Sequence, residues 1–250
     1  QLGKDSHTWA IRLEQIRAAL NGQVGDRKLR LGIAGGEWLK MVGNETARTN
    51  FANNVKNVLD KYNMDGVDLD FEWAYYASDL TNYSKAIVKL RNVLGKNVFF
   101  TVSLHPVSYK ISKEAIAAVD FISLQCYGPS PVRFPIEKYC SDIQMVLEYG
   151  IPKEKLVAGV PFYGVTKDNS KKTEAYFNFV QNGLVTSPAQ NEVIYQGDTY
   201  VFDGQDNIRI KTRYAKEQKL KGMMSWDLAT DLPLSDSRSL LKTMTEELRE

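Results

Sequence analysis

One pattern recurs along this chain and constrains its fold most: a short strand of β-branched or aromatic residues, a turn, and then a longer segment with helical spacing. Strand character is found in Leu29–Ala34, Val67–Phe71, Val98–Leu104, Phe121–Tyr127, Leu156–Val160 and Gly222–Trp226. Helical spacing is found in Thr8–Leu20, Thr49–Tyr62, Leu80–Leu94, Lys113–Ala118, Ile136–Tyr149, Asp206–Leu220 and Ser237–Leu248. Several of the strands are apolar on both faces, as in a parallel sheet covered by helices. The pattern therefore predicts an α/β fold.

The number of strands bears on how this sheet is closed. Six strands are predicted, whereas a closed TIM-type (β/α) barrel has eight. A length of 250 residues suits a single barrel, and no Pro/Gly/Ser-rich linker divides the chain. We expect one catalytic domain over residues 1–250, a TIM-type barrel that lacks its first two strands or has them truncated, or a sheet closed in another way. Residues 165–205 would form a small insertion before the last strand, with a hairpin over Val193–Phe202 that turns at Gly197-Asp198.

The charges of the chain are balanced. Lys and Arg number 32 against 30 Asp and Glu, a net charge of +2, and the basic residues are scattered. This distribution argues against nucleic acid or an anionic membrane as the main partner, and no apolar run is long enough to span a bilayer. We expect a monomer that binds an uncharged or polar ligand. The segment after Gln1 has no leader-like pattern, which leaves a trimmed chain and a cytosolic protein both open.

The most informative stretch is an acidic strand, Asp65-Gly-Val-Asp-Leu-Asp-Phe-Glu-Trp73. The strand period of two places Asp68, Asp70 and Glu72 on one face and the intervening apolar residues on the other. Carboxylates this close raise the pKa of at least one of them, which is how an acid is prepared for proton transfer near neutral pH. The row therefore predicts acid–base catalysis.

Two other interpretations of the acidic row are open. It could be an edge strand whose carboxylates are solvated, although the apolar residues between them favour burial of the opposite face. It could also be a divalent cation site, since carboxylate oxygens suit magnesium, but the sequence offers no cluster of further ligands. We expect no metal and no cofactor.

The spacing Asp-Gly-x-Asp-x-Asp-x-Glu resembles the signature of glycoside hydrolase family 18, which includes chitinases, endo-N-acetylglucosaminidases and chitinase-like lectins. Further segments follow in the family's order: the helix Asn50–Tyr62, Val119–Ile122 leading to Gln125–Tyr127, Lys155–Gly164 and Gly222–Trp226. The resemblance implies retaining, substrate-assisted hydrolysis of β-1,4-linked N-acetylglucosamine polymers. It also implies a (β/α) barrel, an oligosaccharide or polysaccharide partner, and a secreted or extracellular location.

The resemblance assigns catalytic roles to four residues. Glu72 corresponds to the general acid that protonates the glycosidic oxygen. Asp70 corresponds to the acid that holds the acetamido N–H of the substrate, and Asp68 to its buried supporter. Tyr127 corresponds to the hydroxyl that steadies the acetamido oxygen, with plain core packing as the alternative for this residue.

The resemblance also indicates the residues that bind the sugar. Trp226 corresponds to the indole beneath the reacting sugar, where an aromatic face meets apolar C–H groups. Core packing is the alternative for Trp226. The other substrate-binding candidates are Gln125, Trp73 and Tyr163.

The sequence departs from the family pattern in two places. Gly128 stands where chitinases often carry Asp or Asn, so a hydrogen-bonding group beside the acetamido oxygen is missing and the rate could suffer. Trp38 follows Glu37, so its position relative to the substrate is not fixed by the motif. A chitin-binding lectin without turnover and an enzyme acting on N-glycans are the alternative functions, although retention of Glu72 favours turnover. The small insertion favours endo-type cleavage.

Three remaining residues have two interpretations each. Cys126 and Cys140 are either buried thiols or a disulfide that closes a short loop. His105 follows a strand and precedes a proline; it is either a polar residue at the strand end or a residue that faces the substrate.

Overall fold

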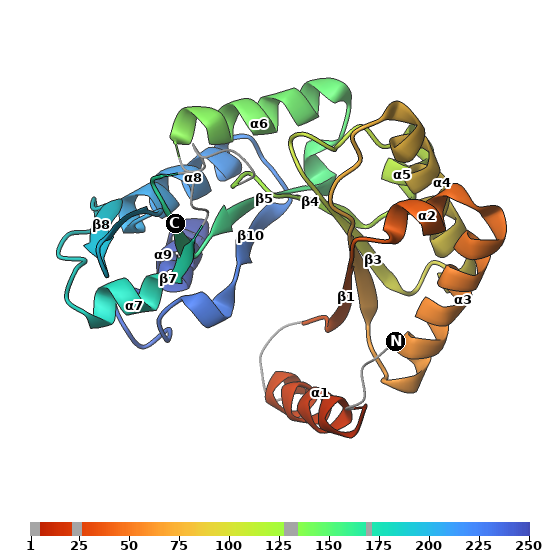
Figure 1. The fold of residues 1–250 in the computed structure, drawn as a ribbon, viewed down its shortest axis with the longest axis horizontal. Helices are drawn as coiled ribbons and strands as arrows, with labels where there is room; N and C mark the ends of the chain where they lie inside the picture. The colour runs from red at the N-terminus through yellow and green to blue at the C-terminus, as the bar shows by residue number, and fades with distance from the viewer. Residues whose placement is uncertain (1–5, 22–26, 128–134, 169–171) are drawn as a thin grey trace. The chain divides into compact units, whose positions relative to one another are not determined.

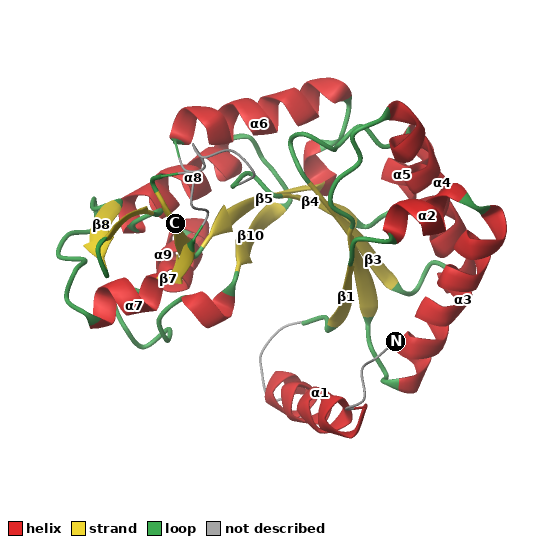
Figure 2. Cartoon of the chain, in the orientation of Figure 1, coloured by secondary structure: helices red, strands yellow, loops and turns green. Residues whose placement is uncertain are grey.

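The computed structural model describes residues 6–21, 27–127, 135–168 and 172–250. The chain divides into two compact units, one formed by residues 1–103 and 110–120 and the other by residues 104–109 and 121–250. Figure 2 shows strands and helices alternating in both units. The expectation of a single catalytic domain over residues 1–250 stays a prediction.

The first unit contains three parallel strands in the order β1-β2-β3 and a set of helices. Its elements are α1 (Ser6–Asn21), β1 (Arg30–Ala34), α2 (Trp38–Gly43), α3 (Glu45–Lys61), β2 (Gly66–Asp70), α4 (Ala77–Leu94), β3 (Phe99–Leu104) and α5 (Lys113–Ala118). In Figure 1 the helices α2 to α5 lie on one side of these strands. The central strand β2 therefore has a covered face and a second face that carries its acidic residues.

The covered face of β2 explains why this segment is a strand. Val67 and Leu69 are completely buried, and Phe71 just beyond the strand is nearly so. The ring of Phe71 stacks on Trp38 of α2 at 5.3 Å between ring centroids and packs against Tyr83 of α4. Burial of such apolar side chains is the main stabilising contribution in a core of this kind. The expected helix layer behind the acidic strand is confirmed.

One helix of the first unit begins earlier than its apolar spacing indicates. The predicted start at Thr49 is wrong, because α3 begins at Glu45. The side chain of Asn44 accepts a hydrogen bond from the backbone N–H of Ala47 and caps the helix there. Asn is among the preferred N-cap residues, so the signal was present in the sequence.

The second unit contains the other parallel strands, in the order β4-β5-β10, and a separate antiparallel sheet. Its elements are β4 (Phe121–Leu124), α6 (Ile136–Tyr149), η1 (Lys153–Lys155), β5 (Leu156–Pro161), β6 (Tyr163–Thr166), β7 (Thr173–Ala175), α7 (Tyr176–Gln181), β8 (Glu192–Tyr195), β9 (Asp198–Val201), α8 (Gln205–Glu217), β10 (Gly222–Trp226), η2 (Leu228–Thr230) and α9 (Leu240–Arg249). β5 is buried along its whole length. Among the described residues the two units contain six parallel strands, which confirm the α/β class and are two fewer than a closed barrel contains.

The insertion before the last strand builds more structure than its predicted hairpin. The antiparallel sheet has the order β7-β6-β9-β8. It therefore contains β6 and β7 in addition to the two strands of the hairpin. The hairpin of β8 and β9 is present, but its predicted turn at Gly197-Asp198 is wrong. The turn residues are Gln196 and Gly197, with φ of 51° and 87°. Positive φ at both central residues is the pattern of a type I′ turn, whose twist matches that of the flanking strands.

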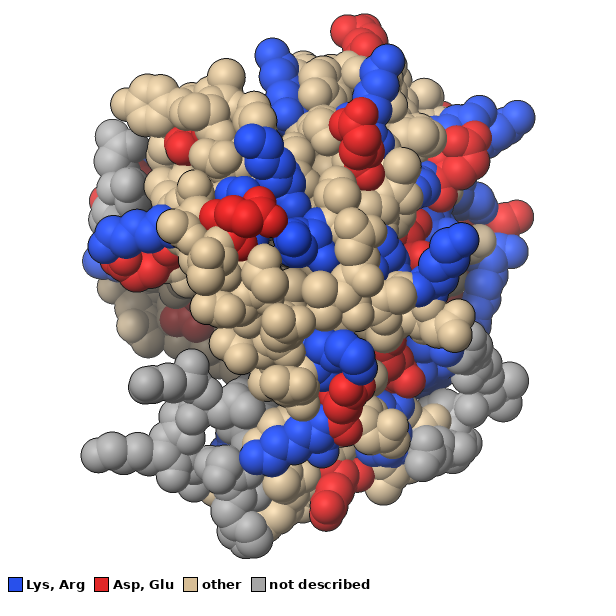
Figure 3. Space-filling model, turned by 90° about the vertical axis from the view of Figure 1, so that its right-hand side faces the viewer, with Lys and Arg blue, Asp and Glu red and all other residues tan. Residues whose placement is uncertain are grey.

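Charges of both signs are mixed on the face of the molecule shown in Figure 3. On α3, for example, Lys56 pairs with Asp60 at 2.7 Å, and Glu45 contacts both Arg48 and Lys89. Among the described helices, none is long and apolar enough to cross a bilayer.

Candidate active site

The acidic residues of β2 lie on the face opposite the helix layer. Asp68 and Asp70 are half-buried within the strand, while Glu72 follows it and has an exposed side chain. β2 pairs with β1 on one side and β3 on the other. The interpretation of an edge strand with solvated acids is therefore wrong, and the carboxylates belong to the interior of a sheet.

Asp68 is held by side chains from both neighbouring strands. One carboxylate oxygen accepts hydrogen bonds from the Thr101 hydroxyl and, at 3.5 Å, from the Arg30 guanidinium; the other accepts one from the Ser103 hydroxyl at 2.8 Å. Arg30 also donates to the Thr101 hydroxyl. Donors of this kind stabilise a charged carboxylate that the sheet partly removes from water. The free-energy cost of removing the Asp68 carboxylate from water is thus offset by hydrogen bonds from residues of the two neighbouring strands.

The residues that support Asp68 were not among the predicted site residues. Thr101 lies directly opposite Asp68 in the register of β2 and β3, and Ser103 is two positions further along β3. Residues two apart on a strand share a face. The alternation of Thr101 and Ser103 in an otherwise apolar strand could have predicted a polar face on β3. The contact of Arg30 with Asp68 joins two separate strands, so no local sequence pattern predicts it.

The backbone that carries Glu72 is held in place by the core. The indole N–H of Trp38 donates to the Glu72 carbonyl oxygen at 3.0 Å, and Trp38 itself is only 5% exposed. The peptide bond between Glu72 and the half-buried Trp73 is cis. Trp38, whose position the motif left undefined, is therefore a core residue that fixes the end of the acidic strand.

A buried tyrosine lies within the electrostatic range of the same acids. Burial raises the pKa of Tyr83 well above its usual value, and the charges of Asp68 and Asp70 raise it further. Its hydroxyl donates to the carbonyl oxygen of Leu69 at 3.4 Å. Tyr83 is consequently neutral at physiological pH. It packs behind β2, and the charges of the acids on that strand act on its hydroxyl.

Three of the predicted site residues lie in the second unit near the end of β4: the buried Gln125 and Tyr127, and Tyr163, which contacts Tyr127. Gln125 and Tyr127 are each 7% exposed and follow β4. The Tyr127 ring lies edge-on to Tyr163 with 6.4 Å between centroids, and its hydroxyl is 3.8 Å from the Met224 sulfur. A methyl group added at Gly159 would lie 3.0 Å from the Tyr127 ring, so the absence of a side chain there makes room for the tyrosine. Tyr127 is thus a packed residue, and its role toward a substrate stays a prediction.

Trp226 differs from these residues in its exposure. It ends β10 opposite Pro161, and its side chain is 55% exposed. Its backbone carbonyl accepts a hydrogen bond from the Phe162 N–H at 2.8 Å, and the bond to Asp227 is a cis peptide. The core-packing alternative for Trp226 is wrong, because the second unit presents this indole at its surface.

The structure decides between the alternatives for the cysteines, whereas the choice between the two interpretations of His105 stays a prediction. Cys126 and Cys140 are thiols, so the disulfide is wrong. Burial, with a smaller contribution from the charge of Asp142, raises the pKa of the Cys126 thiol to about 12. His105 is 3% exposed and its ring nitrogen Nδ1 accepts from the Val107 N–H at 3.3 Å, as expected of a residue built into a strand end.

Two further expectations concern metal binding and the position after Tyr127. Within the described ranges, no group of three or more His, Cys, Asp or Glu side chains is arranged to hold a metal ion. Gly128, the departure from the family pattern, lies outside the described residues.

The sequence matches known proteins over most of its length. Residues 12–231 match the family model described as Glycosyl hydrolases family 18. The chain is 26% identical over 264 residues to a class V chitinase of Arabidopsis thaliana, covering 82% of this chain and 69% of that protein. Across six curated relatives, the chain spans from 28% to 69% of the relative's length.

Solved structures share the fold at low sequence identity. A chitinase from Cycas revoluta in complex with (GlcNAc)3 is 20% identical, with a TM-score of 0.80 and coverage of 99% of this chain and 87% of that one. A chitinase-like agglutinin from Robinia pseudoacacia is 16% identical, with a TM-score of 0.78 and coverage of 98% and 87%. The same fold therefore occurs in a chitinase and in an agglutinin, so the fold does not by itself decide between turnover and binding.

Proposed function

Because this chain belongs to family 18 of the glycosyl hydrolases, we propose that it hydrolyses β-1,4-linked N-acetylglucosamine polymers with retention of configuration at the anomeric carbon. The observation that carries the proposal is the arrangement on β2. Asp68 is anchored by donors from both neighbouring strands, Asp70 follows on the same face, and Glu72 stands beyond the strand end with an exposed side chain. This arrangement supports the assignment of Glu72 as a proton donor beside carboxylates that the strand holds.

In the proposed reaction Glu72 acts as the general acid. Its carboxyl group donates a proton to the glycosidic oxygen while the bond from that oxygen to C1 breaks. The carbonyl oxygen of the substrate's own 2-acetamido group attacks C1 and forms an oxazolinium ion, since this family uses substrate assistance. The Glu72 carboxylate then takes a proton from water as the water attacks C1 and opens the ring, which restores the acid.

The two aspartates support this reaction at the acetamido group. Asp70 accepts a hydrogen bond from the acetamido N–H, which orients the carbonyl oxygen toward C1 and stabilises the positive charge of the oxazolinium ion. Asp68 keeps Asp70 in position and adds to the negative potential. The bonds from Thr101 and Ser103 support the proposal, because they fix Asp68 on the face where Asp70 lies.

Sugar binding is assigned to aromatic residues. The exposed indole of Trp226 offers an apolar face of the kind that stacks on a pyranose ring. Within 165–205, the residues that the structure describes contribute only a small sheet and one short helix, which is little material for enclosing a polymer chain. We therefore infer endo-type cleavage, with products of mixed length from the earliest times.

A chitin-binding lectin is the second candidate function, because the same fold also occurs in a chitinase-like agglutinin. One experiment separates the two. The protein is incubated with chitin hexasaccharide and, in parallel, with a high-mannose glycopeptide, and the products are followed by mass spectrometry. Shorter chitin oligosaccharides from the wild type but not from Glu72→Gln support the enzyme. If calorimetry detects oligosaccharide binding but neither variant forms a product, the protein is a lectin. If only the glycopeptide is cleaved, the substrate is an N-glycan rather than chitin.

A further inference from the structure

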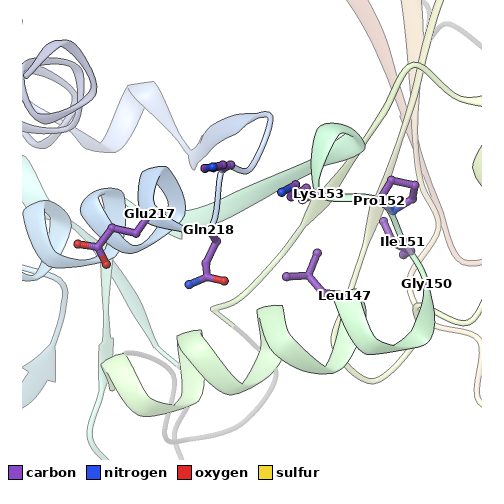
Figure 4. A pocket seen from close by; sticks show the side chains of 8 residues that line it. Leu147, Gly150, Ile151, Pro152, Lys153, Glu217 and Gln218 are labelled. Carbon is purple, nitrogen blue, oxygen red and sulfur yellow. The ribbon is translucent and has the colours of Figure 1, made fainter.

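A pocket of about 500 Å³ lies in the second unit, at the end where β5 and β10 begin. We name it the helix-end pocket, because the C-terminal ends of α6 and α8 form two of its sides (Figure 4). It is lined by Leu147, Gly150, Ile151, Pro152, Lys153, Glu217, Gln218 and Lys219. None of these lining residues is a predicted site residue, and Trp226 is at the opposite end of β10. Its volume is within the range of small-molecule sites.

Lys219 adopts a backbone conformation that its residue type disfavours. Its φ is +57°, in the left-handed region, at the end of α8. The corresponding turn at the end of α6 uses Gly150, with φ of 109°. Glycine is the usual residue in such a turn because it has no Cβ to clash. A lysine at this position is retained at a cost in backbone energy, as are Asn63 and Gln196 with φ of 47° and 51°.

The pocket carries hydrogen-bond donors in excess of acceptors. Among the residues that the structure describes, the ammonium groups of Lys153 and Lys219 have no hydrogen-bond or ion-pair partner. The side-chain oxygen of Gln218 accepts from Gln144 at 3.2 Å, whereas its amide N–H groups have no acceptor in the described part of the chain. We call Lys153, Lys219 and Gln218 the donor set. Together these groups give the pocket two positive charges and a neutral donor.

The acidic residue of the lining does not neutralise this charge. Figure 4 shows the Glu217 carboxylate turned away from Lys153, with Gln218 between them. Glu217 acts instead on Arg213, one turn earlier on α8, whose guanidinium pKa is raised mainly by Glu247 and further by Glu217. The lysines therefore contribute positive charge to the pocket, against the partial negative charge of the two helix C-terminal ends.

The lysines are not needed to cap the two helices. At the end of α6, the N–H groups of Gly150 and Ile151 already bond the last carbonyl oxygens. At the end of α8, the N–H groups of Lys219 and Leu220 do the same. Backbone turns of this type satisfy the helix end without side chains. A favourable interaction with the helix dipole would in any case not require the strained position of Lys219.

We propose that the helix-end pocket binds a small organic anion with an oxyanion head and an apolar body. The head is held by the donor set through charge-assisted hydrogen bonds. The body packs against Leu147, Ile151 and Pro152, and Figure 4 shows the Leu147 side chain pointing into the gap from α6. Such a site is independent of the proposed glycosidase activity.

The test uses phenyl phosphate as the probe and the full chain with labelled Leu and Ile methyl groups. Saturable shifts of the Leu147 and Ile151 methyl signals are expected. Inorganic phosphate, which has the head alone, should bind more weakly, and phenol, which has the body alone, should not bind. Absence of saturable shifts, or equal shifts with phenol, overturns the proposal.

The decisive variant is Lys219→Gly, because its effects on stability and on binding have opposite signs. Glycine relieves the left-handed strain, so Tm should rise. Loss of one charge-assisted bond should weaken phenyl phosphate binding at least about tenfold. Gln196→Gly is the matched control, since it relieves the same kind of strain in the β8–β9 turn and should leave binding unchanged. Lys219→Arg should retain binding. Wild-type affinity in Lys219→Gly assigns the lysine a purely structural role and overturns the proposal.

Discussion

Lys211→Met removes the cation from an ion pair that lies wholly inside the second unit. The Lys211 ammonium is 2.6 Å from a carboxylate oxygen of Asp203, and both side chains are at most 2% exposed. The remaining Asp203 oxygen accepts from Asn207 at 3.2 Å. Lys211 also lies 5.5 Å from the centre of the Tyr139 ring, so the pair joins α8 to α6.

The expected size of the effect follows from this geometry. At 2.6 Å and an effective dielectric constant near 20, the attraction between the charges is about 6 kcal/mol. Desolvation offsets much of that, but removing one partner leaves the other charge buried, which typically costs about 3–5 kcal/mol. We expect Lys211→Met to lower the free energy of unfolding by this amount and, for a chain of this length, to lower Tm by about 6–20 °C.

The pH dependence of this loss can be worked out from Asp203. Burial already raises the pKa of its carboxyl group, and loss of the lysine raises it further. Between the unfolded pKa and this higher folded pKa, the folded state binds more protons than the unfolded state, so stability falls as pH rises. The destabilisation by Lys211→Met should therefore be largest at neutral pH and shrink toward pH 4.

Urea unfolding followed by tryptophan fluorescence measures the effect at neutral and acidic pH. The double variant Asp203→Asn/Lys211→Met is the matched control, because it removes both charges and keeps the shape and the Asn207 contact. It should recover stability to within about 1 kcal/mol of the wild type. A loss of less than about 1 kcal/mol in Lys211→Met at neutral pH, or no recovery in the double variant, would refute the reasoning.

Two further predictions concern the thiols and the support of Asp68. In the native protein, iodoacetamide should alkylate the partly exposed Cys140 and leave Cys126 unmodified until denaturant is added, because burial raises the pKa of Cys126 to about 12. Peptide mass mapping measures the labelling, and equal labelling of both cysteines would contradict this. Ser103→Ala removes one of the donors to Asp68 and should lower kcat about tenfold or more; an unchanged kcat would show that the bond is unimportant for catalysis.

The sequence was sufficient for the features that depend on periodicity. The buried Val67 and Leu69 and the half-buried Asp68 and Asp70 alternate in the structure as the strand period predicts. The helices behind them follow from the same kind of argument, because an apolar stripe at helical spacing has to be covered. Such patterns depend only on neighbouring residues in the chain.

Features that depend on long-range contacts or on capping were missed. The reach of Arg30 to Asp68 and the hydrogen bond from Trp38 to the Glu72 carbonyl join separate elements and leave no local pattern. The early start of α3 and the shifted hairpin turn were missed for a different reason. Asn44 and Gln196 set these boundaries through side-chain capping and positive φ, which the apolar spacing does not register.

The configuration of the first product at its anomeric carbon distinguishes substrate-assisted hydrolysis from other mechanisms. Chitin hexasaccharide is added to the wild-type protein, and proton nuclear magnetic resonance spectra are recorded before the product equilibrates by mutarotation, with Glu72→Gln as the blank. Participation of the acetamido group predicts that the β-anomer appears first and that the blank gives no product. An α-anomer as the first product, or equal turnover by Glu72→Gln, would contradict the proposed chemistry.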